Sequence, residues 1–240
     1  MHLRTSLDPP PVSHHDTTVD NGRVSPELVI FDLDGTLTDS AVGIVSSFRH
    51  ALAAIGAEVH EDDTTLARRV VGPPMHHTLH SMGLGERAAE AISAYRADYL
   101  DRGWAMNRVF EGMPEVLADL GAAGVRMVVA TSKAEPTAKR ILAHFGLDHH
   151  FEVIAGASPD GTRAAKSDVI THALGQLTAP AERLLMVGDR SHDVEGAAEH
   201  GIDTVLVEWG YGADDFTDST VLRPWKSVAT VGDLREVLGV

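Results

Sequence analysis

Five short apolar runs, separated by helical patterns, limit this chain to a small set of folds. Runs of this length without polar alternation are typical of strands that are buried on both faces of a parallel sheet. The helical patterns between them cover residues 114–120, 136–145, 166–174 and 193–200. Strands that alternate with helices predict an α/β fold, here a Rossmann-like, doubly wound parallel sheet. The apolar runs are Leu28 to Phe31, Val125 to Ala130, Phe151 to Ile154, Leu184 to Val187 and Thr204 to Val207.

Residues 41–110 interrupt this alternation, because they carry helical patterns and no convincing strand. Apolar side chains recur at helical spacing from Val42 to Ile55, and a second helical pattern runs from Glu86 to Arg102. We therefore expect an all-helical cap domain over residues 41–110, inserted into a core made of residues 27–40 and 111–240.

Net charge, cysteine content and hydropathy exclude several function classes. The formal net charge of −15 repels nucleic acid and anionic lipid, so we expect no nucleic-acid partner and no membrane. The absence of cysteine excludes disulfides, thiolate catalysis and zinc–cysteine sites. No apolar run reaches the roughly 20 residues of a membrane span and no secretory pattern is present, so we expect a cytoplasmic protein. Residues 1–26 are polar and proline-rich, which predicts a flexible leader.

Polar side chains follow the predicted strands at the points where the strands end. The carboxyl ends of parallel strands share one edge of a sheet, so we expect these side chains to meet there. One of them, a lysine, begins the helix that follows the third apolar run. The residues at these positions are Asp32 and Asp34, Thr131, Ser132 and Lys133, Lys166, and Asp189 and Asp193.

The carboxylates among these residues indicate the chemistry. Carboxylates that crowd together repel one another unless a cation neutralises them. Oxygen ligands without cysteine or suitably spaced histidine suit a hard divalent ion, and Mg²⁺ in particular. A Mg²⁺ ion readily accepts a phosphate oxygen, so the sequence predicts phosphoryl transfer.

The same residues form four ordered motifs, Asp32-x-Asp34-Gly35-Thr36-Leu37, Thr131, Lys166 and Gly188-Asp189-x-x-x-Asp193. Over about residues 27–240 the chain thereby resembles the haloacid dehalogenase superfamily. The helical insert between the first and second motifs resembles that family's first type of cap. Within that family, a carboxylate at Asp34 implies phosphatase or phosphotransferase chemistry rather than dehalogenase chemistry. The stretches from Asp34 to Ser40 and from Trp209 to Gly212 resemble phosphoglycolate phosphatases and related nucleotidases.

The resemblance implies a role for each residue in the hydrolysis of a small phosphorylated substrate. Asp32 would attack phosphorus and become an aspartyl-phosphate. Asp34 would protonate the leaving oxygen and then activate water. Thr131 would donate a hydrogen bond to the phosphoryl group, with Ser132 as an alternative donor. Lys166 would neutralise the nucleophile and the phosphoryl oxygens.

The resemblance also implies how the cofactor Mg²⁺ is held. Asp32 and Asp189 would bind it through their side chains, and Asp34 through its backbone carbonyl. Asp193 would orient a ligand or a metal-bound water. Gly35 would allow a tight turn beside the substrate, where a side chain would clash.

Several alternatives remain at this point. Further stretches, among them residues 70–75 and 102–107, resemble a mycobacterial type of protein-tyrosine kinase built on this fold, which would imply a protein partner. A binding protein without turnover is a third hypothesis. Lys133 competes with Lys166 for the catalytic position. His76, His77 and His80 form either a metal cluster or a solvated helix face. Residues 70–74 form either a substrate-contacting loop or a plain helix break.

Overall fold

The computed structural model describes residues 25–240 except residues 74, 159 and 219. Within these residues, the strands of the main sheet are β1 (Leu28–Phe31), β4 (Arg126–Ala134), β5 (Val153–Ala157), β6 (Leu184–Gly188), β7 (Asp203–Val207) and β8 (Lys226–Val228). Their order is β5-β4-β1-β6-β7-β8, and every neighbouring pair is parallel. Parallel neighbours need crossover connections, and those from β1 to β4, from β4 to β5 and from β6 to β7 contain helices. The predicted doubly wound α/β fold is confirmed.

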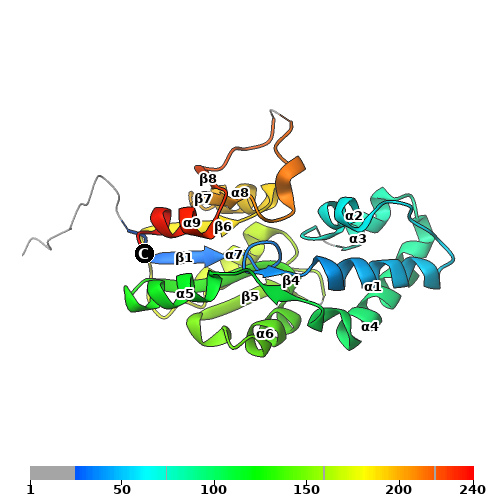
Figure 1. The fold of residues 1–240 in the computed structure, drawn as a ribbon, viewed down its shortest axis with the longest axis horizontal. Helices are drawn as coiled ribbons and strands as arrows, with labels where there is room; N and C mark the ends of the chain where they lie inside the picture. Colours follow the sequence, from blue (N-terminus) through cyan, green and yellow to red (C-terminus); the bar gives the residue numbers. More distant parts are fainter. Residues whose placement is uncertain (1–24, 74, 159, 219) are drawn as a thin grey trace, which may run out of the picture.

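Helices cover both faces of this sheet (Figure 1). They are α5 (Met113–Ala122), α6 (Glu135–His144), α7 (Lys166–Leu174), α8 (Ser191–Ala198) and α9 (Val231–Leu238). Helices α5, α6 and α9 share one apolar cluster with the sheet, and α7 and α8 share a second. The sheet is therefore the middle layer of three.

The central strand β1 requires both helical layers. Val29 and Phe31 belong to one apolar cluster, and Leu28 and Ile30 belong to the other. All four side chains are fully buried. Successive residues of a strand point to opposite faces, so a strand that is apolar throughout is stable only between two covering layers.

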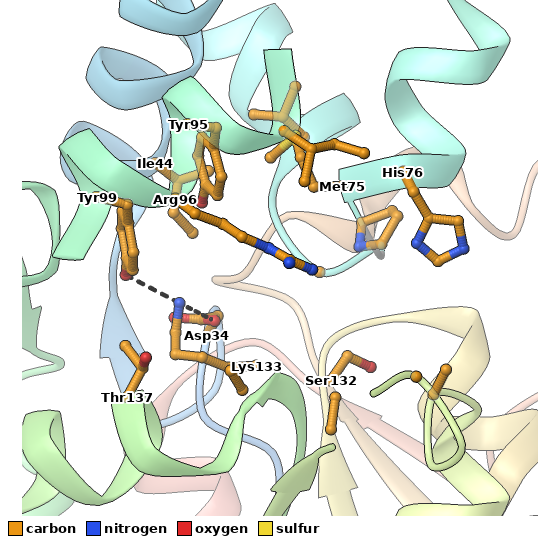
Figure 2. Close-up of a pocket in the computed structure, with 18 of the residues that line it drawn as sticks. Asp34, Ile44, Met75, His76, Tyr95, Arg96, Tyr99, Ser132, Lys133 and Thr137 are labelled. Atoms are coloured by element: carbon orange, nitrogen blue, oxygen red, sulfur yellow. Dashed lines mark hydrogen bonds and ion pairs between the residues drawn. The ribbon is translucent and has the colours of Figure 1, made fainter. Parts of the chain in front are cut away.

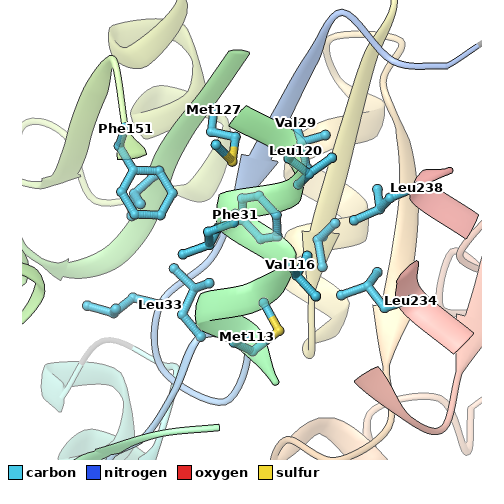
Figure 3. Packing of buried hydrophobic residues seen from close by; sticks show 14 of the residues in the cluster. Val29, Phe31, Leu33, Met113, Val116, Leu120, Met127, Phe151, Leu234 and Leu238 are labelled. Atoms are coloured by element: carbon cyan, nitrogen blue, oxygen red, sulfur yellow. The ribbon is translucent and has the colours of Figure 1, made fainter. Parts of the chain in front are cut away.

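Leu120 of α5 lies in the first of these clusters, shown in Figure 3, and is fully buried. Replacing Leu120 by Ala is expected to lower the free energy of unfolding by about 2–5 kcal/mol, because lost contacts and a residual cavity add together. Leu222→Ala is the matched control, since Leu222 is 47% exposed and such changes stay within about 0.5 kcal/mol. Urea unfolding measures both effects. Equal stability of the two variants would contradict this description of the core.

Residues 41–105, called the helical segment below, form a separate group of helices at the carboxyl ends of the strands. Figure 1 shows the arrow of β1 directed toward this segment. The segment has its own apolar cluster, which includes Phe48, Leu66 and Leu79. Its helices are α1 (Ala41–Ala54), α2 (Asp63–Val70), α3 (Met75–Ser81) and α4 (Ala88–Asp101).

Three strand features differ from the sequence prediction. The antiparallel strands β2 (Thr38–Asp39) and β3 (Arg108–Val109) pair where the helical segment joins the core, so the expectation of no strand in residues 41–110 is wrong at β3. Strand β8 was not predicted. Two or three residues are too few to establish a hydrophobic period. Strand β4 continues past its apolar run through Thr131 to Ala134, with a shift of register there.

None of the helices in the described part of the chain is both long and apolar enough to cross a membrane. The expected flexible leader lies outside the described residues, apart from Ser25 and Pro26.

Candidate active site

Asp32 and Asp34 lie in the turn after β1. The amide of Asp32 donates to the carbonyl of Val187 at 2.9 Å, so the pairing of β1 with β6 continues to this residue. The carbonyl of Leu33 then accepts a hydrogen bond from the amide of Thr38 at 3.0 Å, which closes the turn. Both aspartates are buried, with 2% and 6% of their surface exposed.

Lys166, the first residue of α7, is buried between two carboxylates. Its Nζ lies 2.8 Å from Oδ1 of Asp32 and 2.7 Å from Oδ1 of Asp193. It also donates to the carbonyl of Ala130 at 3.0 Å. Burial alone would lower the pKa of Lys166, but the carboxylates of Asp193 and Asp32 raise it above its usual value. The buried ammonium of Lys166 thus forms ion pairs with the carboxylates of both Asp32 and Asp193.

Asp193 ties this ion pair to the start of α8. Its Oδ2 accepts hydrogen bonds from the amides of Asp189 and Arg190, at 3.1 and 3.0 Å. Burial alone would raise the pKa of Asp193, but Lys166 lowers it below the usual value. Both carboxylate oxygens are therefore already engaged, one with Lys166 and one with the backbone.

Asp189 differs, because one of its oxygens is free. Its Oδ2 accepts from the amide of Tyr211 at 2.7 Å, whereas its Oδ1 is buried without a hydrogen-bond partner among the described residues. Two glycines enclose the carboxylate: a Cβ would lie 2.2 Å from Oδ2 at Gly35 and 2.3 Å from it at Gly210. Gly35 also has φ +89°, a conformation that glycine favours. Asp189 fits only because both positions lack a side chain.

Asp32 and Asp189, with Asp193 beside them, form a buried acidic group that suits a divalent cation. Each offers a carboxylate oxygen, and these oxygens lie within 4.8 Å of one another. Burial raises the pKa of Asp32 to about 6, and burial with the charges of Asp193 and Asp32 raises the pKa of Asp189 well above its usual value. A bound cation would relieve this repulsion and occupy the free oxygen of Asp189. The donor set is all oxygen, which fits Mg²⁺.

Asp34 forms an ion pair with a different lysine, Lys133. Lys133 Nζ lies 2.9 Å from Asp34 Oδ2 and donates to the hydroxyl of Tyr99 at 2.9 Å. Oδ1 of Asp34 is buried without a hydrogen-bond partner among the described residues. The two lysines that competed in the sequence are therefore both at this edge of the sheet, Lys166 at Asp32 and Lys133 at Asp34.

The two candidate hydroxyl donors lie side by side in β4. Thr131 is 1% exposed, and its Oγ1 accepts from the amide of Lys133 at 3.2 Å. A hydroxyl that accepts one bond still has its proton to donate, so Thr131 remains available to a phosphoryl group. Ser132 is half-buried and lines a neighbouring cavity.

That cavity has a volume of 430 Å³ and lies between the helical segment and the ends of β4 and β5 (Figure 2). Tyr95, Arg96 and Tyr99 of α4 line it from one side, and Ser132 and Lys133 from the other. Asp34 also lines it, whereas Asp32, Thr131 and Lys166 are buried at the same edge of the sheet. The cavity therefore reaches Asp34, while Asp32 lies deeper at the same edge.

The sequence model of the haloacid dehalogenase-like hydrolases matches residues 29–207, which hold all the predicted site residues. The chain belongs to this family. The matching model describes the family as haloacid dehalogenase-like hydrolases. The family resemblance of the four motifs is therefore confirmed.

Three similar proteins stand out. Tyrosine-protein kinase PtkA of Mycobacterium tuberculosis is 68% identical over 216 residues, 90% of this chain and 74% of that protein. A 5'-nucleotidase of Pseudomonas aeruginosa is 40% identical over 212 residues, 88% of this chain and 94% of the nucleotidase. The crystal structure of a predicted phosphatase from Clostridium acetobutylicum superimposes with a TM-score of 0.81 at 34% identity, covering 90% of this chain and all of that one.

In this hydrolase, Arg190 joins the core to the helical segment. Its Nη1 donates to the carbonyls of Arg68 and Val71, at 2.7 and 2.9 Å, at the end of α2. Its Nε pairs with Asp215 at 2.9 Å. Because Arg190 directly follows Asp189, the turn that holds Asp189 is tied through Arg190 to the end of α2.

Tyr211 makes a second connection. Its amide binds Asp189, and its hydroxyl donates to Asp39 Oδ1 at 2.6 Å, beside the first turn of α1. Sequence reasoning did not assign a role to Arg190 or Tyr211. Their positions in the sequence could have indicated a role. Arg190 stands between two predicted site aspartates, and Tyr211 lies within the stretch that resembles phosphoglycolate phosphatases.

The structure also bears on the two alternatives in the helical segment. His76, His77 and His80 are exposed on α3, and the metal-capable group found among the described residues does not include them. Their exposure favours the solvated face, although His76 also lines the cavity. Val70, Gly72 and Pro73 line the cavity, which favours the substrate-contacting loop over a plain helix break.

Proposed function

We propose that this hydrolase is a Mg²⁺-dependent phosphatase of small phosphomonoesters, phosphoglycolate-like or nucleotide-like, and that it works through an aspartyl-phosphate on Asp32. The observation that carries this proposal is the pair of buried carboxylates, Asp32 with Lys166 and Asp34 with Lys133, beside a cavity of substrate size. The 40% identity to a 5'-nucleotidase supports it. The expected cytoplasmic location stays a prediction.

The catalytic residues would divide the reaction into two steps. An oxygen of Asp32 forms a bond to phosphorus while the bond to the leaving oxygen breaks, and Asp34 gives that oxygen a proton. Asp34 then takes a proton from water, which attacks phosphorus and releases phosphate and the free carboxylate of Asp32. Lys166 offsets the charge of Asp32, and Thr131, or Ser132, donates a hydrogen bond to the phosphoryl group.

Asp32 and Asp189 would hold Mg²⁺ through their side chains and Asp34 through its backbone carbonyl. The ion supplies charge neutralisation for the phosphoryl oxygens when it is bound. Asp193, whose oxygens are both engaged, would keep Lys166 and the turn at Asp189 in position.

Residues 41–110, which include the helical segment, would act as a cap over a core made of residues 27–40 and 111–240. The cavity enclosed between α4 and the ends of β4 and β5 supports this assignment. Cap closure would exclude water from the reacting group and select small substrates, and opening would admit them.

A protein-tyrosine kinase is the second candidate, because the chain is 68% identical to a protein named a tyrosine-protein kinase. On this scaffold a nucleotide would donate its terminal phosphoryl group, and a tyrosine hydroxyl would replace water as the acceptor. The sequence contains neither a Gly-x-x-x-x-Gly-Lys-[Ser/Thr] loop nor a His-Arg-Asp catalytic loop. The kinase proposal therefore depends on the similarity alone.

Phosphate release from a panel of esters tests the proposed function. The panel contains phosphoglycolate, nucleoside monophosphates, sugar phosphates and an aryl phosphate, each with Mg²⁺ and with a chelator. We expect Mg²⁺-dependent release from at least one ester. If no ester is hydrolysed while labelled nucleotide phosphorylates a tyrosine substrate, the phosphatase proposal is wrong and the kinase proposal replaces it.

Gly35→Ala is expected to reduce Mg²⁺-dependent turnover by at least about 100-fold, since a displacement of about 1 Å at a site costs this much. The added Cβ would meet Oδ2 of Asp189 at 2.2 Å and push the carboxylate away. Gly124→Ala is the matched control, because Gly124 has a positive φ of +76° and nothing within 4 Å of its Cβ. It shares the backbone strain without the clash. Equal activity of the two variants would contradict the role of Asp189.

A further inference from the structure

The cavity beside Asp34 has a wall that the proposed catalytic roles leave unused. Tyr95 and Tyr99 of α4 lie stacked, with ring centroids 5.5 Å apart and planes 12° apart. Met75 and Ile44 extend this apolar surface in Figure 2. A volume of 430 Å³ falls in the range of sites that enclose a whole small molecule, roughly 300–1,000 Å³. The wall therefore suits the organic part of an ester rather than its phosphoryl group.

Arg96 is the charged group on this wall. It belongs to α4, lines the cavity, and extends across it in Figure 2. It forms no hydrogen bond or ion pair with any residue that the structure describes. Other arginines of the helical segment do have carboxylate partners, as Arg49, Arg69 and Arg102 show. Arg87 also lacks one, but Arg87 does not line the cavity.

The remaining charges around the cavity do not compensate Arg96. Lys133 and Asp34 neutralise each other at 2.9 Å. His76, which also lines the cavity, has its pKa lowered by burial and by the charges of His77, His80 and Arg96, which favours its neutral form. In a chain with a net charge of −15, Arg96 gives this cavity a local positive charge.

We propose that Arg96 binds a second negatively charged group on the leaving group of the substrate. The substrate class is then a phosphomonoester whose organic part is apolar or aromatic and carries a carboxylate or a second phosphate. This inference deepens the proposed function and rests on it. A planar guanidinium binds carboxylate or phosphate through two parallel hydrogen bonds, and the tyrosine wall packs the organic part between Arg96 and Asp34.

The test uses two phosphonates that cannot be hydrolysed, benzylphosphonate and para-carboxybenzylphosphonate, which differ only in the carboxylate. Calorimetric titration with Mg²⁺ present measures the affinity of each for the full chain, for Arg96→Met and for Arg87→Met. Arg87→Met removes the same charge from an exposed site of the same segment, away from the cavity. We expect the wild-type chain and Arg87→Met to prefer the carboxylated ligand by about 10-fold to 100-fold, and Arg96→Met to lose this preference.

Two results would overturn the inference. One is the same ratio of affinities in all three proteins. The other is an equal loss for both ligands in Arg96→Met, which would mean that Arg96 contacts the phosphoryl group instead. Turnover of the corresponding phosphate esters is measured separately. Carboxylate-selective binding without turnover would refute the phosphatase proposal alone, whereas turnover without selectivity would refute the role of Arg96 alone.

Discussion

Asp32→Asn is expected to reduce phosphate release from every substrate by about 10⁴-fold or more, the scale seen when a covalent nucleophile is removed. An amide has nearly the shape of the carboxylate, so the side chain can keep a contact with Lys166 while losing its nucleophilic charge. Phosphate release with saturating Mg²⁺ measures the effect, and circular dichroism checks that the variant is folded.

Asp63→Asn is the matched control for that variant. It removes the same charge from a side chain that is 75% exposed and pairs with Arg49 on the outside of the helical segment. Its turnover should equal that of the wild-type chain. An Asp32→Asn variant that keeps activity within 10-fold of the wild type would refute the covalent mechanism, since no other described carboxylate contacts Lys166 except Asp193.

Asp34→Asn is expected to lower turnover by about 10²–10⁴-fold, the usual contribution of a general acid–base group. The loss should be larger for alkyl esters, whose leaving oxygen needs a proton, than for aryl esters, whose phenolate leaves unaided. Rapid-quench kinetics with an aryl phosphate should show a burst of phenol equal to the enzyme present, because the amide that replaces the carboxylate cannot activate water for the second step.

The outcome that would contradict this role is an equal loss for both ester types without a burst. Lys133→Met provides a comparison, because Lys133 contacts the carboxylate of Asp34 at 2.9 Å and the Tyr99 hydroxyl without being assigned a proton transfer. It should reduce turnover of alkyl and aryl esters to a similar degree and show no burst.

Much of the site was predictable because the carboxyl ends of parallel strands share one edge of a sheet. β1 is recognisable from four apolar residues, and the residues directly after it must lie at the carboxyl edge of a parallel sheet. The same reasoning predicted that Asp189 and Lys166, which are far from β1 in sequence, lie at that edge. The short strands β2, β3 and β8 could not be recognised from the sequence, because their pairing depends on neighbouring strands rather than on their own composition.

The residues that connect the helical segment with the core could not be predicted in this way. Arg190 binds backbone carbonyls at the end of α2, and a carbonyl has no sequence signature. Sequence also could not show which lysine pairs with which aspartate, because the partners of Lys133 and Lys166 depend on the three-dimensional path of the chain. Nothing in the sequence distinguishes Arg96 from other surface arginines. Its position on the cavity wall is visible only in the structure.

The phosphoenzyme is the most direct test of the central claim that Asp32 carries the phosphoryl group. Asp34→Asn is mixed with an aryl phosphate and Mg²⁺, quenched in acid, digested, and analysed by mass spectrometry. We expect one phosphoryl group on the peptide that contains Asp32, labile to base, and none in the Asp32→Asn, Asp34→Asn double variant. Release of phenol and phosphate without phosphorylation of this peptide would contradict the account and would indicate direct attack by water.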